Sequence, residues 1–570
     1  MGKGCRARIF HINDVYLLDN LASLKCCVEK ESSDLPPSNV ITVLAGDFLA
    51  PSLLSSLDHG ISMVDMMNRV PVDVVCFGNH EADVPYVSLK HRIREYNGVW
   101  LNSNMPGWGT LEDEPHCPEN HLFEFEGGRS VAMIGLNVGG GENASLYREG
   151  AFGGHAETIV PVLEAVDGAL AKAKAKYPSA DLIIPLTHQS IPDDVKLAQR
   201  GLVPLILGGH DHCEYDETFN GCRVLKAGED AKNVIIVDLF WPEEAPQGSP
   251  PEITVTWKHL VKPKQKKGEP PVEWTQEYPP CEKTAAAADR WMGPAKELMV
   301  ATLEKVPLDG PPLTSVGVRK GPSSMATLIA TAMRDAVGAD ACFVNSGAVR
   351  AKKTYTDGII TYADLSAECP FPTINFVIKV IGSVMSEALA ASRVPWPEEF
   401  ADALQCDDGI TVDEGHRILT VKGEAFDPDK MYLLLCDTYM CGANTALNKW
   451  VTENPALVPP EDAGFPALPI LVRYFCDKAW RGLSDLDGDG VVTRDEIDAF
   501  FEQADSDCSG GLCEGEILRA LEERIPHMAS NVVAKQMMIL ADKNCDGRVS
   551  RDELVDVMIA RLESRQAGAA

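Results

Sequence analysis

The chain has 570 residues, of which 45% are hydrophobic and 24% charged, and its formal net charge is −32 at pH 7. This length exceeds what one hydrophobic core can organise, so we expect roughly three or four domains. The acidity disfavours DNA or RNA polymers as partners, and the lack of an apolar run of about 18 residues disfavours a membrane span. The N-terminus runs into a first strand with no secretory leader, which predicts a cytoplasmic protein.

Five short apolar runs in the first 212 residues each predict a β-strand, and each is followed by side chains that can bind a metal. The runs span residues 8–13, 40–45, 72–77, 182–186 and 202–207. Because ligand sites gather at the carboxyl ends of strands in α/β domains, we expect these side chains to lie together. The candidates are Asp14, Asp47, Asn79, His188, His210 and His212.

Carboxylate, amide and imidazole groups suit two borderline divalent transition ions, such as zinc, manganese or iron. Asp47 is the natural bridge, because a carboxylate can offer one oxygen to each ion. The order of the motifs resembles the calcineurin-like metallophosphoesterase family, and within it the branch with a 5'-nucleotidase C-terminal domain. The motifs are Asp14, Gly46-Asp47, Gly78-Asn-His-Glu81, His188 and Gly209-His-Asp-His212.

The resemblance implies an α/β fold with a four-layer αββα metallophosphoesterase domain, a second α/β domain of the 5'-nucleotidase C-terminal type, and hydrolysis of phosphoesters by a hydroxide held between two metals. It also implies that His80 stabilises the phosphoryl transition state and the leaving oxygen, oriented by Asp83. A histidine oriented by a carboxylate is sound general-acid chemistry in its own right.

One position departs from the family pattern. The first strand of the family ends in Asp-x-His, and here the residues are Asp14-Val15-Tyr16. If the phenol of Tyr16 coordinates, it favours a harder, more highly charged ion such as ferric iron. If it does not coordinate, the first metal position is weaker, and of these two alternatives we favour the second.

The domain limits follow from composition and pattern. We expect a metallophosphoesterase domain over 5–260, an exposed excursion and connector helix over 261–312, a substrate domain over 313–460 and a helical tail over 467–565. The connector helix is expected at 284–305, with a break or kink at Gly293-Pro294.

The second domain carries the residues that the resemblance assigns to the substrate. Arginine suits this role because a planar guanidinium grips phosphate with two parallel hydrogen bonds, and aromatic side chains can stack on a base. The candidates are Arg319, Asn345, Gly347, Arg350, Phe371 and Tyr439. For both aromatic residues, packing in the core is the alternative.

In this domain the sequence departs from the family pattern at several positions, so it does not identify the leaving group of the substrate. Pro322 and Thr327 replace a glutamate and an asparagine of the family, and 441–444 replaces its Gly-Gly-Asp turn. A nucleoside monophosphate is the first choice of substrate, followed by a cyclic nucleotide or a nucleotide sugar. The eroded turn and Tyr16 also motivate a rival reading, an inactive calcium-binding scaffold.

Three twelve-residue segments beginning at 485, 505 and 542 match the EF-hand calcium loop. We therefore expect an all-α EF-hand tail that binds Ca²⁺ in up to three loops. The predicted ligands are Asp485, Asp487, Asp489, Val491, Glu496, Asp505, Asp507, Ser509, Gly511, Glu516, Asp542, Asn544, Asp546, Arg548 and Glu553.

The spacing of the loops predicts which of them pair. The second and third start 37 residues apart (505 to 542), which leaves room for two helices, whereas the first and second start 20 apart (485 to 505) and must share one short helix. We expect the second and third loops to pair. Calcium would either regulate the hydrolase, with a target protein as a further partner, or only stabilise the tail.

Overall fold

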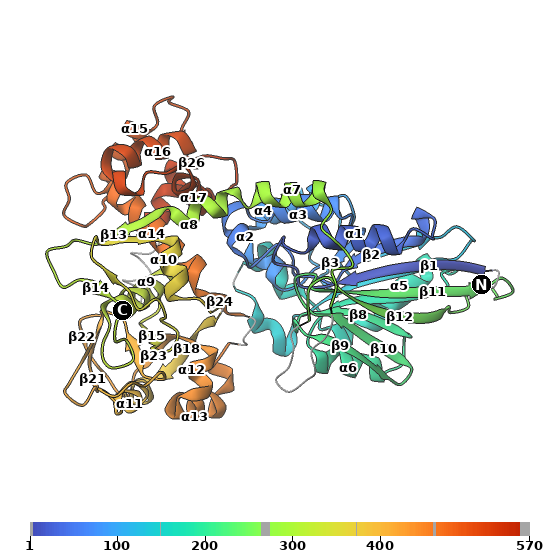
Figure 1. Ribbon diagram of the computed structural model, residues 1–570, viewed down its shortest axis with the longest axis horizontal. Coiled ribbons are helices and arrows are strands. Elements are labelled where there is room, and N and C mark those ends of the chain that lie inside the picture. The colour runs from blue at the N-terminus through green and yellow to red at the C-terminus, as the bar shows by residue number, and fades with distance from the viewer. Residues whose placement is uncertain (1–3, 149, 264–273, 372, 460–462, 559–570) are drawn as a thin grey trace. The chain divides into compact units, whose positions relative to one another are not determined.

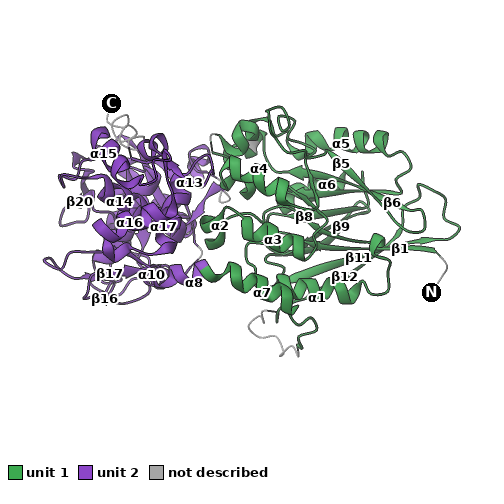
Figure 2. Cartoon of the chain, turned by 90° about the horizontal axis from the view of Figure 1, so that it is seen from above, with its two compact units in different colours: residues 1–293 green, residues 294–570 purple. Residues whose placement is uncertain are grey.

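The computed structural model describes residues 4–148, 150–263, 274–371, 373–459 and 463–558 (Figure 1). The chain forms two compact units, residues 1–293 and residues 294–570 (Figure 2). Among the described residues, no helix combines the length and apolar character that crossing a membrane requires.

Unit 1 contains two six-stranded sheets. The first has the order β12-β11-β1-β2-β3-β4, with β1 to β4 parallel and β11 and β12 antiparallel to their neighbours. Its strands are β1 (Gly4–Ile12), β2 (Val40–Leu44), β3 (Val74–Cys76), β4 (Val99–Leu101), β11 (Asn233–Pro242) and β12 (Glu252–His259).

The second sheet has the order β5-β6-β7-β8-β10-β9, in which β6, β7, β8 and β10 are parallel. Its strands are β5 (Asn120–Glu124), β6 (Ser130–Asn137), β7 (Leu182–His188), β8 (Leu205–Gly209), β9 (Glu214–Phe219) and β10 (Cys222–Ala227). Its buried β7 and β8 read as continuous apolar runs in the sequence because both faces of the sheet are covered.

The core of unit 1 lies between the two sheets. Val43 and Val74 of the first sheet belong to the same buried cluster as Ile184 and Leu207 of the second. Helices α1 (Leu21–Glu31), α3 (Ile61–Arg69) and α7 (Glu282–Trp291) lie outside the first sheet, and α5 (Val162–Lys176) and α6 (Ile191–Gln199) lie outside the second (Figure 2). The predicted αββα layering is confirmed.

Unit 2 begins with a second α/β domain around one mixed sheet of order β19-β15-β23-β18-β24. The strands are β15 (Ala341–Asn345), β18 (Ile374–Ile381), β19 (Leu404–Cys406), β23 (Met431–Asp437) and β24 (Phe465–Pro466). Helices of this domain include α9 (Ser324–Val337), α10 (Tyr362–Glu368), α11 (Gly382–Arg393), α12 (Thr438–Ala443) and α13 (Thr445–Glu453). Phe343, Ile378, Leu389 and Leu434 are central to its core.

A helical tail completes unit 2. It contains α14 (Ala467–Ser484), α15 (Arg494–Ala504), α16 (Glu514–Arg524) and α17 (Asn531–Ala541). The short strands β25 (Gly511–Leu512) and β26 (Val549–Ser550) pair antiparallel, so the second and third calcium loops are joined as predicted. Helix α15 leaves the first loop and enters the second, which is the shared helix that the spacing required. Residues 559–565 of the predicted tail lie outside the described residues.

The last segment of the connector differs from the prediction, because the helix predicted over 284–305 ends at residue 300. The structure has α7, then α8 (Gly293–Val300), and then the strand β13 (Thr302–Lys305), which pairs with β17 (Ile359–Thr361). Leu303 is 1% exposed, so the last segment gains both a buried side chain and a strand partner by leaving the helix. Most of the predicted excursion, residues 264–273, lies outside the described residues.

Candidate metal centre and substrate pocket

The predicted metal ligands of unit 1 lie at or just after the carboxyl ends of β1, β2, β3, β7 and β8. Asp14, Asp47, His210 and His212 all have positive φ angles, of 52°, 55°, 92° and 55°. Left-handed backbone is uncommon for residues other than glycine and is concentrated at functional sites. The chain therefore leaves β1, β2 and β8 through sharp turns that carry donor side chains.

One group of donor atoms lies between β2, β3, β7 and β8. His188 Nε2 is 3.0 Å from Asp47 Oδ2 and 3.2 Å from Asn79 Oδ1. His210 Nδ1 is 3.1 Å from the same Asn79 oxygen. These separations match those of donors around a single transition ion with bonds of about 2.1 Å.

A second group shares Asp47 Oδ2 with the first. The Tyr16 hydroxyl oxygen is 3.2 Å from Asp47 Oδ2, 3.3 Å from Asp14 Oδ1 and 2.9 Å from His212 Nε2. His212 Nε2 is 3.4 Å from Asp14 Oδ1. The structure thus brings all six predicted ligands into two adjacent groups joined by one carboxylate oxygen, an arrangement whose chemistry fits two divalent ions.

The two carboxylates are oriented by other hydrogen bonds. Asp14 Oδ2 accepts from Asn13 Nδ2 at 2.6 Å and from the His210 backbone N–H at 2.8 Å, while Asp47 Oδ1 accepts from the His80 backbone N–H at 2.8 Å. Each carboxylate therefore turns one oxygen to the protein and the other to the donor groups. Burial raises the pKa of Asp47, but the charges of His188 and His80 outweigh burial and lower it below its ordinary value.

Glu81 positions the β2 and β3 turns, a role that we did not predict from the sequence. Its buried carboxylate accepts backbone N–H groups of Asp47, Phe48 and Gly78 at 3.0, 2.8 and 2.7 Å. Burial and the nearby Asp47 charge raise the pKa of Glu81 to about 7. A Cβ atom on Gly78 would lie 2.1 Å from Asp47 Oδ1, so only glycine fits beside the bridging carboxylate.

Lys226 performs the corresponding task for the β7 and β8 turns, and it was also missed. Its side chain is 0% exposed, and its Nζ donates to Gln189 O at 2.6 Å and Gly209 O at 2.7 Å. The same ammonium pairs with Asp194 at 3.0 Å and with Asp211. One buried cation therefore ties the turn after His188 to the turn that carries His210 and His212.

His80 lies at the edge of the donor groups, as the proposed acid requires. Its Nδ1 is 2.7 Å from Asp83 Oδ2, and Asp83 also faces the Arg148 guanidinium at 3.4 Å. Burial lowers the pKa of His80, but Asp47 and Asp83 raise it to about 9. A protonated His80 can donate a proton to a leaving oxygen at neutral pH.

The predicted substrate residues meet in unit 2. A cavity of about 430 Å³ is lined by all of them and by several residues that we did not select. The predicted set is Arg319, Asn345, Gly347, Arg350, Phe371 and Tyr439. The additional lining residues are Ala348, Thr373, Ala401, Asp402 and Asp437. Nothing in the local sequence around Asp402 signalled its role, which depends on a contact with Tyr439 of α12.

The two aromatic residues of this pocket are exposed rather than packed in the core. Phe371 and Tyr439 are 46% and 54% exposed, so the core-packing alternative is wrong for both. The Arg350 guanidinium lies 5.0 Å from the Phe371 ring centre, and the Tyr439 hydroxyl donates to Asp402 at 3.0 Å. Exposed rings with oriented polar neighbours can stack on a flat ligand.

The residues that replace the family turn have a structural task. Asn444 Oδ1 accepts the backbone N–H groups of Ala446 and Leu447 at 3.1 and 3.2 Å and so caps α13. Its amide donates to Ala388 O at 3.1 Å. Asp437 caps α12 by accepting the Met440 N–H at 2.6 Å, which leaves its carboxylate at the pocket wall.

The calcium loops fold in the expected way. In each loop the first aspartate accepts the backbone N–H of the glycine at position 6, at 3.0, 2.9 and 2.8 Å for Asp485, Asp505 and Asp542. The predicted ligands at 485, 487 and 489 lie together, as do those at 505, 507 and 516. Arg548 of the third loop contacts Ser509 and Gly511 O of the second.

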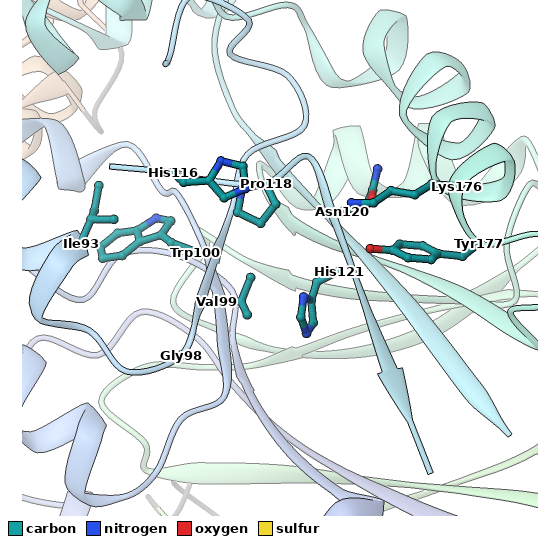
Figure 3. Close-up of a pocket in the computed structure, with 10 residues that line it drawn as sticks. All are labelled: Ile93, Gly98, Val99, Trp100, His116, Pro118, Asn120, His121, Lys176 and Tyr177. Carbon is teal, nitrogen blue, oxygen red and sulfur yellow. The ribbon is translucent and has the colours of Figure 1, made fainter. Parts of the chain in front are cut away.

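A further cavity of about 370 Å³ lies at the edge strands of unit 1 (Figure 3). Gly98 and Val99 at the start of β4 and His121 near the start of β5 line it, with Tyr177 after α5. The start of β4 is the opposite end of the parallel strands from the metal donors, and no predicted site residue lines this cavity.

The fold and the paired donor groups define a metallophosphoesterase. The family model of the calcineurin-like phosphoesterase matches residues 7–214, that of the 5'-nucleotidase C-terminal domain matches 299–452, and that of the EF-hand domain pair matches 497–559. The chain is a calcineurin-like metallophosphoesterase with a 5'-nucleotidase C-terminal domain and an EF-hand pair.

Relatives share most of the chain at low identity. The Bacillus subtilis uncharacterized metallophosphoesterase YunD is 22% identical over 491 residues, which cover 80% of this chain and 96% of YunD. The trifunctional nucleotide phosphoesterase protein YfkN of B. subtilis is 24% identical over 486 residues, covering 76% of this chain but 31% of YfkN. The solved Haemophilus influenzae NAD nucleotidase has a TM-score of 0.58 at 17% identity, covering 82% of this chain and 96% of that chain, and it shares the fold.

Proposed function

We propose that this protein hydrolyses phosphoesters of nucleotides, with nucleoside monophosphates as the first substrate class. The observation that carries the proposal is the meeting of the six predicted ligands in two groups that share the Asp47 Oδ2 oxygen, with His80 beside them. The match to YfkN, whose name describes a nucleotide phosphoesterase, supports the substrate class. The nearest alternatives are cyclic nucleotides and nucleotide sugars.

The roles of the residues follow from their positions. Asp14, Asn79, His188, His210 and His212 would hold the two metals, with Asp47 between them. When bound, the metals supply a hydroxide nucleophile and neutralise the charge on the phosphoryl oxygens.

His80 is directed at the leaving group rather than at the metals. Because Asp83 fixes its Nδ1, the ring is oriented to give the other proton, on Nε2, to the leaving oxygen.

Recognition of the nucleotide is assigned to the pocket of unit 2. Phe371 and Tyr439 present exposed rings for a base, and stacking contributes about 1 to 3 kcal/mol per contact. Arg319 and Arg350 offer guanidinium groups for phosphate oxygens. Asp402, which orients the Tyr439 hydroxyl, can accept hydrogen bonds from a base or a ribose.

The test is a substrate panel measured on the full chain loaded with manganese, zinc or iron. The panel contains nucleoside monophosphates, cyclic nucleotides, nucleotide sugars and an aryl phosphate. We expect hydrolysis of a nucleotide, and a loss in His80→Ala of about 100-fold or more in kcat with the metal content retained. His116→Ala, an exposed histidine outside the site, is the matched control.

The proposal is wrong if no member of the panel is hydrolysed with any of the three metals. That result would favour the calcium-binding scaffold instead. Near wild-type turnover in His80→Ala would support the hydrolase activity but would contradict the role of His80 as the general acid.

A further inference from the structure

We propose that the phenolic oxygen of Tyr16 is the fourth donor of the metal position formed with Asp14, Asp47 and His212, and that it makes this position selective for ferric iron. The inference rests on the proposed function only in assuming that metals occupy the donor groups. It replaces our preference from the sequence, in which Tyr16 does not coordinate.

The first argument is the spacing of the donor atoms. For bonds of about 2.1 Å, neighbouring donors around one ion lie about 3.0 Å apart in octahedral and about 3.4 Å apart in tetrahedral geometry. The Tyr16 oxygen lies 3.3, 3.2 and 2.9 Å from its Asp14, Asp47 and His212 neighbours. The group without a tyrosine, around Asn79 and His188, shows separations of 3.0 to 3.2 Å.

The second argument is that hydrogen bonding does not account for the contacts with both carboxylates. The 2.9 Å contact with His212 Nε2 has the length of an ordinary hydrogen bond, but a phenol carries one proton and cannot also donate fully to both Asp14 and Asp47. Hydroxyl-to-oxygen hydrogen bonds are usually about 2.7 to 2.8 Å long, and both distances to the carboxylates exceed 3.1 Å. The two separations of 3.3 and 3.2 Å instead match the spacing of donors that surround one cation.

The third argument is that the side chain is held in place. The Tyr16 backbone N–H donates to Asp230 Oδ1 at 3.1 Å, and the Val15 N–H donates to Asp47 O at 2.8 Å. The ring makes edge contacts with the rings of His212 and His80, at centre distances of 5.3 and 6.3 Å. The phenol is therefore positioned by the same turn that carries Asp14.

The choice of ion follows from charge and hardness. Two carboxylates and a phenolate would place three negative charges on this position, where the family pattern has an imidazole in place of the phenol. Hard anionic oxygen donors favour a harder, more highly charged ion. On binding, the phenol proton is released to solvent, and the iron enters as ferric ion, so no electron transfer is required.

The experiment measures metal binding without substrate. The full chain is stripped with a chelator, supplied again with Ca²⁺, and loaded with ferric nitrilotriacetate, Mn²⁺ or Zn²⁺. Metal content per chain and the visible absorption spectrum are recorded for the wild type and variants. Tyr147→Phe is the control, because the Tyr147 hydroxyl lies near the same turns but donates to Val138 O at 2.6 Å.

We expect the ferric-loaded wild type and Tyr147→Phe to show a phenolate-to-iron charge-transfer band, and Tyr16→Phe to lack it. Tyr16→Phe should also lose affinity for one of two ions by about tenfold or more. Tyr16→His should bind two ions without the band. An unchanged spectrum and two ions of unchanged affinity in Tyr16→Phe would overturn the inference.

These outcomes are separate from those of the substrate panel. If the absorption band depends on Tyr16 but the chain hydrolyses no substrate, the inference is supported and the proposed function is wrong. If the chain hydrolyses a nucleotide but its spectrum does not depend on Tyr16, the proposed function is supported and the inference is wrong.

Discussion

Lys226 shows how one side chain can organise ligands that it does not touch. Its ammonium is surrounded by the backbone carbonyls of Gln189 and Gly209 and by the carboxylates of Asp194, in α6, and Asp211. Removing one partner of a buried ion pair costs about 3 to 5 kcal/mol, because the other charge stays buried and unpaired. Supporting residues of this kind typically change metal affinity by about 10- to 100-fold.

We therefore expect Lys226→Met to lower the free energy of unfolding by about 3 kcal/mol or more and to weaken transition-metal binding. Lys172→Met, which breaks an exposed pair with Glu119, should change stability by less than about 1 kcal/mol. Denaturant unfolding and metal titration measure the two effects. A Lys226→Met protein as stable as the control would show that the buried cation is dispensable.

The positively charged Arg548 side chain of the third calcium loop contacts the second calcium loop. Its guanidinium donates to Gly511 O at 2.9 Å, contacts Ser509 and lies 3.5 Å from Asp507 Oδ2, all predicted calcium ligands of that loop. Calcium must displace this contact, so we expect Arg548→Ala to raise calcium affinity several-fold, as the loss of an exposed ion pair allows.

Calorimetric titration of the full chain with Ca²⁺ measures this change. Arg551→Ala is the matched control, because Arg551 contacts Asp498 and Glu502 rather than predicted ligands. Equal affinities in the wild type and both variants would exclude competition by Arg548.

The sequence predicted those site residues whose spacing is local. Gly78-Asn-His-Glu and Gly-His-Asp-His are short motifs at strand ends, and the structure brings their side chains together. Glu81, Lys226 and Asp402 were missed because their roles arise from contacts with residues that lie far away in the sequence. A buried charge has no signature in the chain until its partner is known.

At the scale of elements, apolar periodicity located the strands but not every boundary. β2 matches its predicted span closely, whereas β3 is shorter and β7 extends to include His188 itself. The segment 302–305 was assigned to a helix because its apolar residue fits either pattern. This segment forms a strand because it pairs with β17, and such a tertiary contact cannot be predicted from the neighbouring residues in the sequence.

Helix α14 and strand β24 join the calcium tail to the substrate domain. β24 extends the main sheet by pairing with β18, with Pro466 opposite Ile374 and Phe465 opposite Asn375. Ala467 at the start of α14 lines a small cavity that Phe371 also lines. A movement of α14 would therefore reach the wall of the nucleotide pocket.

From this shared wall we predict that Ca²⁺ changes the KM for the nucleotide more than it changes kcat. Turnover is measured across micromolar Ca²⁺ with the transition metal held fixed, in the wild type and in Glu516→Gln with Glu553→Gln, which removes the last ligand of both paired loops. The variant should not respond. A flat profile in the wild type would assign calcium a purely structural role.

At the scale of the whole molecule, the described residues gather two kinds of donor group with different chemistry. Unit 1 gathers imidazole, amide and carboxylate donors that suit transition ions, and the tail of unit 2 offers oxygen donors that suit calcium. The strongly acidic composition, with a net charge of −32, is in keeping with a protein that binds several cations. The imidazole donors of unit 1, rather than total charge, separate the two kinds of donor group.

The most direct test of the central claim is to titrate the stripped chain with Mn²⁺ at fixed Ca²⁺ while recording bound metal and nucleotide hydrolysis together. We predict that turnover rises with two bound Mn²⁺ ions per chain, and that Asp47→Asn binds fewer ions and loses about 100-fold or more in kcat, whereas the exposed Asp167→Asn behaves as the wild type. Undiminished hydrolysis in Asp47→Asn, or in the stripped chain, would contradict the account.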